Sequence, residues 1–149
     1  MQAYKLILIA VDGSPVSDRA LQEAITLAQE SQAQLRIVHV IDEMALNLDM
    51  GFADINETLA YIHTAGKQTL EHAMQQAQDR GIKPESKLVT IETPGMRVGE
   101  VIAQEAVDAK ADLIVMGTHG RRGISRVFMG SVADTVVRVA VPPVLLVRQ

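Results

Sequence analysis

The chain has 149 residues, 48% of them hydrophobic and 21% charged, which excludes a disordered chain and fits one globular domain. Its 14 basic residues against 18 acidic ones give a formal charge of −4, so no overall positive surface attracts nucleic acid. It contains no cysteine, which excludes disulfides and thiolate metal sites. No apolar run is long enough for a signal-peptide core or a membrane span. We therefore expect a single domain over residues 1–149, located in the cytoplasm.

The first half of the chain predicts two strands and two helices. Residues 6–11 form a continuous apolar run, which is typical of a strand covered on both faces. Ser14 can cap a helix with Pro15 at its first position. In chain order we expect a strand over 6–11, a helix from Pro15 with an apolar stripe reaching Ala28, a strand over 35–41, a loop over 42–55, and a long helix from about Glu57 to Arg80-Gly81.

The second half continues the alternation of strands and helices. Thr93-Pro94-Gly95 breaks the third strand, and a glycine-rich segment separates the fourth strand from a short helix. In chain order we expect a strand over 87–91, a helix over 98–109, a strand over 112–116, a helix over 132–139 and a strand over 143–147.

This alternation predicts the α/β fold class, with five strands in an open parallel sheet. Ligands of such sheets bind beyond the carboxyl ends of the strands, where the strand order reverses. The loops after strands one, two and four are therefore the first places to look for a binding site.

The segment after strand four, residues 116–132, has the composition of a phosphate-binding loop. It holds four of the ten glycines, which let backbone amides approach a ligand without a Cβ in the way. Gly130-Ser131 opens a helix whose free N–H groups suit an anion. His119, Arg121 and neighbouring arginines add positive charge, although a flexible loop with a solvated basic face would show the same composition.

Known phosphate motifs do not decide between these two interpretations, because neither a P-loop nor a G-x-G-x-x-G fingerprint occurs. However, Gly117, Gly120 and Gly130-Ser131, separated by two and nine residues, match the ATP-binding signature of the universal stress protein family. The chain resembles this family throughout, except in the loop after strand two. The other matching blocks are Val11-Asp12-Gly13-Ser14, His39-Val40, Asp112–Gly117 and Pro142–Val147. The resemblance implies a three-layer, Rossmann-like sheet (adenine nucleotide alpha hydrolase-like) with strand order 3-2-1-4-5.

The resemblance also implies a site for ATP, or for AMP or ADP. Asp12, after Val11, matches the acid that holds the ribose and adenine region, and the backbone of Ala10 and Val40 would line the adenine. The ribose and first phosphates would lie against Met116, Gly117 and Gly120, with Arg121 as an accessory cation. The outer phosphates would bind at Gly130, Ser131 and Val132. An Mg²⁺ or Mn²⁺ ion would be held by the phosphates, because no protein metal site is expected.

Three classes of function are compatible with such a site. The resemblance favours an ATP-binding sensor or regulator in the stress response, which acts through protein partners and at most hydrolyses ATP slowly. One alternative is an adenylyl- or phosphoryl-transferring enzyme, for which we identify no catalytic residue, because His119 could equally donate to a phosphate or be a solvated loop residue. The other alternative is an interaction module that does not need nucleotide.

The last strand predicts how two copies associate. In the strand order that the resemblance implies, it lies at a margin of the sheet, and an apolar margin strand invites pairing with another chain. We therefore expect a two-fold homodimer through Val144–Val147.

Overall fold

The computed structural model describes residues 3–45, 55–119 and 129–149. Within these ranges five strands form one parallel sheet in the order β3-β2-β1-β4-β5, which confirms the predicted fold class and strand order. The strands are β1 (Leu6–Ala10), β2 (Gln34–Asp42), β3 (Glu85–Ile91), β4 (Leu113–Gly117) and β5 (Val144–Val147). The helices are α1 (Pro15–Ser31), α3 (Ile55–Asp79), α4 (Val98–Ala109) and α5 (Ser131–Val139).

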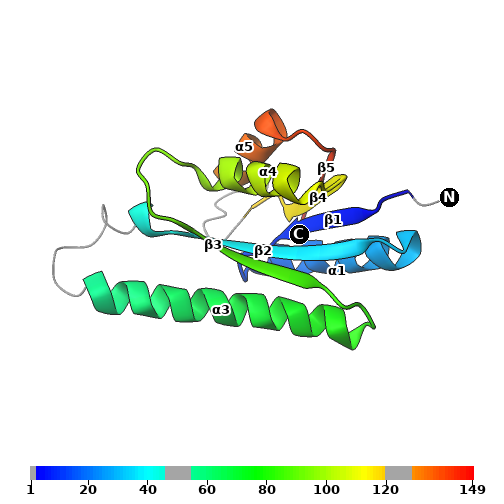
Figure 1. Cartoon of the computed structure of the whole chain (residues 1–149), viewed down its shortest axis with the longest axis horizontal. Coiled ribbons are helices and arrows are strands. Elements are labelled where there is room, and N and C mark those ends of the chain that lie inside the picture. The colour runs from blue at the N-terminus through cyan, green and yellow to red at the C-terminus, as the bar shows by residue number, and fades with distance from the viewer. Residues whose placement is uncertain (1–2, 46–54, 120–128) are drawn as a thin grey trace.

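Helices cover both faces of the sheet, so the fold has three layers (Figure 1). Helices α1 and α3 lie on one face, and α4 and α5 lie on the other. Alternate residues of β1 enter the two cores: Ile7 and Ile9 pack toward α1 and α3, whereas Leu8 packs toward α4 and α5. All three side chains are fully buried. Burial on both faces is the reason that the strand reads as an unbroken apolar run.

Three predicted boundaries differ from the structure. Residues 43–45 form a helical turn rather than loop, because Asp42 Oδ1 accepts hydrogen bonds from the amides of Met44 and Ala45. The predicted loop also ends early, since α3 already begins at Ile55, while residues 46–54 lie outside the described ranges. Strand β3 begins at Glu85, before the predicted start, because its first residues lie on an exposed margin where charged side chains are tolerated.

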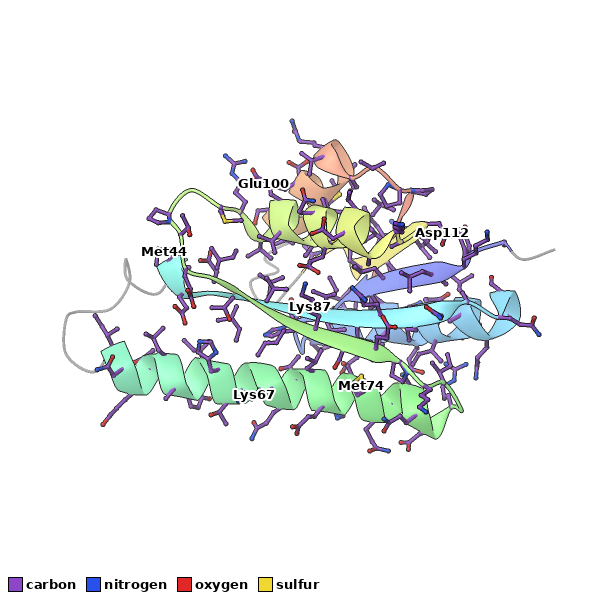
Figure 2. All side chains as sticks on the ribbon, in the orientation of Figure 1. Met44, Lys67, Met74, Lys87, Glu100 and Asp112 are labelled. Carbon is purple, nitrogen blue, oxygen red and sulfur yellow. The ribbon has the colours of Figure 1, made fainter. Side chains whose placement is uncertain are left out.

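The parallel arrangement places every strand's carboxyl end at the same edge of the sheet. Met44 follows the end of β2 and Asp112 precedes β4, and the two residues mark opposite edges in Figure 2. Each helix that follows a strand begins at the carboxyl edge, so the first turns of α1, α4 and α5 lie there. This edge is where the predicted site residues belong.

In the described part of the chain, no helix combines the length and the apolar character that crossing a membrane requires.

Candidate functional site

An apolar surface forms at the carboxyl edge, between the sheet and the two helices α4 and α5. Ala10, Val40, Met116 and Val132, all predicted site residues, pack in the same hydrophobic cluster there. Met116 is buried, whereas the other three are half-buried and form the rim of the cluster. Residues from three strands and one helix thus bring apolar groups to one place, as a planar aromatic ligand would need.

Asp12 lies in the turn between β1 and α1, and its side chain stabilises this turn. Its Oδ1 accepts a hydrogen bond of 2.9 Å from the Ser14 amide. Gly13, between them, adopts a φ of 82°, which few other residues tolerate. Among the residues that the structure describes, none donates to Asp12 Oδ2. One carboxylate oxygen therefore stabilises the turn, and the other can accept a hydrogen bond from a ligand.

The start of α5 has the form of an anion site. Gly130 is the N-cap residue and, as a glycine, has no side chain with which to cap this helix. The first amides of a helix have no partner within it, and they carry the positive end of its dipole. A Cβ at Gly130 would lie 3.0 Å from the carbonyl oxygen of Thr118, and one at Gly117 would lie 3.1 Å from Val16 Cγ1. At both glycines an added Cβ would therefore make a tight contact and require a neighbouring group to move by a few tenths of an ångström.

Thr118 connects the start of α5 to the sheet. Its amide donates to Val147 O at 3.0 Å, and its carbonyl accepts from the Gly130 amide at 2.7 Å. Its hydroxyl lies 3.0 Å from His119 Nδ1. His119 Nε2 is buried, with no hydrogen-bond partner among the described residues. Burial of Nε2 argues against a solvated loop histidine and leaves one nitrogen that a ligand oxygen could satisfy.

Two predicted site residues, Gly120 and Arg121, lie outside the described residues. Val11 and Ser131 are described: Val11 donates its amide to Val38 O at 2.9 Å, and Ser131 is the exposed first residue of α5. In the described ranges, no three His, Asp or Glu side chains gather in a way that could hold a metal ion.

Sequence reasoning missed three residues at this edge. Val98, the first residue of α4, packs against the same apolar cluster as Val40. Its place at the start of a helix could have identified it from the sequence, since a helix that follows a parallel strand starts at the carboxyl edge. His39 and Ser17 bond to the backbone beside Asp12. No spacing rule indicates such contacts, because they join a strand and a helix to a turn.

The universal stress protein family matches this chain over residues 3–148. A universal stress protein of Methanocaldococcus jannaschii is 34% identical, over 98% of this chain and 83% of its own.

Two solved structures share the fold. One is a universal stress protein in complex with cAMP, with 28% identity, a TM-score of 0.71 and 97% of each chain covered. The other is the universal stress protein from Archaeoglobus fulgidus in complex with dAMP, with 26% identity, a TM-score of 0.67 and 99% of each chain covered. The extent of these matches shows that the chain belongs to the universal stress protein family.

Proposed function

We propose that the chain binds an adenine nucleotide, ATP in the first place, at the carboxyl edge of β1, β2 and β4. The observation that carries this proposal is the gathering of four apolar residues beside a helix start whose N-cap residue, Gly130, has no side chain to cap it. An adenine base needs an apolar slot, and a phosphate chain needs convergent N–H donors. The complexes of two structural neighbours with cAMP and dAMP support the same ligand class.

Each part of the nucleotide has a candidate partner. The adenine would lie against Ala10 and Val40, and Asp12 Oδ2 would accept a hydrogen bond from the ribose. The main chain at Met116 and Gly117 would follow the ribose and the first phosphates. The outer phosphates would meet the first amides of α5. From the family resemblance we propose Gly130, Ser131 and Val132 for the outer phosphates. In the loop that precedes them we propose Gly120 for the ribose and first phosphates, and Arg121 as an accessory cation.

A divalent cation would be held mainly by the phosphates. Mg²⁺ keeps several waters and takes few protein ligands, so it needs no cage of protein carboxylates. We propose Mg²⁺ or Mn²⁺ as a companion of ATP rather than as a resident metal of the chain.

We propose a regulatory rather than a catalytic role. Phosphoryl transfer requires a positioned acceptor and charge stabilisation at the γ-phosphate, and we assign no described residue to either task. The nucleotide would instead change a surface that partner proteins of the stress response recognise. Any hydrolysis of ATP would be slow and incidental to this role.

The direct test is to identify what the purified protein carries. Mass spectrometry of the supernatant after denaturation should detect an adenine nucleotide, and calorimetry with ATP should show saturable binding to protein stripped of ligand. Absence of any adenine compound, together with no heat of binding for ATP, ADP, AMP or cAMP, would refute the proposal. Turnover of ATP with a defined acceptor above about 1 per second would identify an enzyme instead.

A further inference from the structure

The peptide group that joins Val11 to Asp12 is held by two side chains from other elements. It lies beyond the last residue of β1, so the sheet ladder does not fix it completely. The Val11 carbonyl oxygen lies 2.7 Å from Nδ1 of His39, in β2. The Asp12 amide donates to Oγ of Ser17, in the first turn of α1, at 3.0 Å. Both polar atoms of this one peptide group are therefore bonded by side chains.

The contact defines the protonation of the His39 ring. A carbonyl oxygen only accepts hydrogen bonds, so Nδ1 must carry the proton. Packing fixes the position of the ring as well, because it lies against α3 where the helix has a glycine. A Cβ at Gly66 would come within 3.1 Å of His39 Cδ2.

Ser17 is similarly constrained. Its side chain is 3% exposed, and its amide donates to Oγ of Ser14 at 3.2 Å. Ser14 in turn donates its amide to Asp12 Oδ1. Hydrogen bonds to neighbouring residues therefore restrain both the backbone and the side chain of Asp12, while Oδ2 accepts no hydrogen bond from the residues that the structure describes.

We infer that His39 and Ser17 are positioning residues of the nucleotide site. They hold the Asp12 carboxylate in its ligand-binding orientation before the nucleotide binds. The inference rests on the proposed nucleotide binding and goes beyond it, because neither residue needs to touch the nucleotide. Preorganisation of this kind raises affinity, since the ordering of the binding group is complete before association.

Two substitutions of nearly equal shape separate positioning from packing. Asn places an N–H₂ donor close to the position of Nδ1, whereas Leu fills the same space without a donor. We expect His39→Leu to weaken ATP binding by about tenfold, the equivalent of about 1.4 kcal/mol, because the Val11 carbonyl loses its partner. His39→Asn should retain affinity within about threefold. Calorimetry gives the affinities, and urea unfolding shows what fraction of each variant is folded.

The effect should also depend on Asp12. If His39 acts through Asp12, adding His39→Leu to an Asp12→Ala chain should weaken ATP binding no further, and Ser17→Ala should show the same dependence. Independent, additive losses would overturn the inference. So would equal affinity of the wild type and His39→Leu. Absence of ATP binding by the wild type would refute the proposed function itself, which is a different result.

The wild-type protein offers a check that needs no variant. Long-range ¹H–¹⁵N spectra should show His39 with a proton on Nδ1. A proton on Nε2 with a bare Nδ1 would contradict the hydrogen bond to Val11 and thus the inference. Addition of ATP should leave the His39 tautomer unchanged while it shifts the Asp12 amide signal.

Discussion

Glycines at the carboxyl edge are required for different physical reasons. Gly13 needs its freedom of backbone conformation, because its φ is 82°. Gly130 has a φ of −63°, which any residue adopts, so its constraint is space alone. A Cβ there would approach the Thr118 carbonyl to 3.0 Å, a contact with backbone rather than with a side chain that can turn away. A substitution at Gly130 therefore moves the helix start itself.

Gly130→Val should abolish ATP binding while the chain still unfolds cooperatively. The branched side chain would push the start of α5 away from Thr118 and cover the amides that face the phosphates. Calorimetry measures the binding, and urea unfolding checks the fold. Gly81→Ala is the control, because Gly81 has a φ of 84° at the end of α3 with open space around it. It should cost about 1 kcal/mol of stability without loss of affinity. Unchanged affinity of Gly130→Val would remove α5 from the site.

Asp12 allows its two tasks to be measured separately. Asp12→Ala removes the acceptor of the Ser14 amide and the oxygen offered to a ligand, so it should lower both stability and affinity. Asp12→Asn retains an Oδ1 acceptor for Ser14 and replaces the free oxygen by an N–H₂ donor. We expect Asn to preserve stability and still to weaken ATP binding by about 1–3 kcal/mol. If Asn binds ATP as well as the wild type, Asp12 is a turn residue only.

At the scale of elements, an ion pair joins helix α4 to strand β3 across the packed face of the sheet. Glu105 of α4 is buried, 7% exposed, and its Oε2 lies 3.0 Å from Nζ of Lys87 in β3. Lys87 is labelled at the centre of Figure 2. A buried carboxylate is costly without a partner, so this pair connects the margin strand to the helix layer.

Lys87→Met should therefore destabilise the fold by about 1–3 kcal/mol, because Glu105 remains buried with its charge unpaired. Replacing both residues, as Lys87→Met with Glu105→Leu, should recover most of that loss. The free energy of unfolding in urea provides the measurement. Lys67→Met on the exposed face of α3 is the control and should change stability by less than about 0.5 kcal/mol. A double variant as unstable as the single one would contradict this role of the pair.

Sequence predicted the elements well where one physical pattern dominates. The buried strands read as apolar runs, and Ser14-Pro15 indicated the start of α1, so these boundaries are right within one residue. It failed at β3 and at residues 43–45, where the local pattern is weak and Asp42 bonds to backbone amides. The site residues taken from motifs and family resemblance stay predictions. His39 and Ser17 were not among them, because side chain to backbone contacts between distant elements leave no periodic pattern in the sequence.

At the scale of the whole molecule, the two margins of the sheet differ in chemistry. The β3 margin carries Glu85 and Lys87, each in an ion pair with a neighbouring element. The β5 margin is apolar: Leu145 is 36% exposed, and Val141, in the segment between α5 and β5, is 81% exposed. Charge protects a strand margin from pairing, and its absence favours pairing. Of the two margins in Figure 1, β5 is therefore the one on which we propose that a second copy binds.

Light scattering after gel filtration should give twice the 16.2 kDa of one chain at micromolar concentration. Leu145→Lys should yield monomers, because a lysine ammonium in the middle of the paired margin would lose its hydration. Tyr61→Lys is the matched control, since Tyr61 is 74% exposed on α3, away from β5, and should leave the dimer intact. A wild-type protein that remains a single chain at these concentrations would refute this interface.

Thr118 gives the two proposals a common consequence. Thr118 joins the last residue of β5 to the N-cap residue of α5, because its amide donates to the Val147 carbonyl and its carbonyl accepts from the Gly130 amide. If the chain pairs along β5 and binds phosphate at α5, as proposed, a displacement at either site would be transmitted to the other through these two hydrogen bonds. Thermodynamic reciprocity then requires that whatever nucleotide does to self-association, self-association does equally to nucleotide affinity. Titrations of ATP at increasing protein concentration would show whether self-association raises or lowers the affinity for ATP.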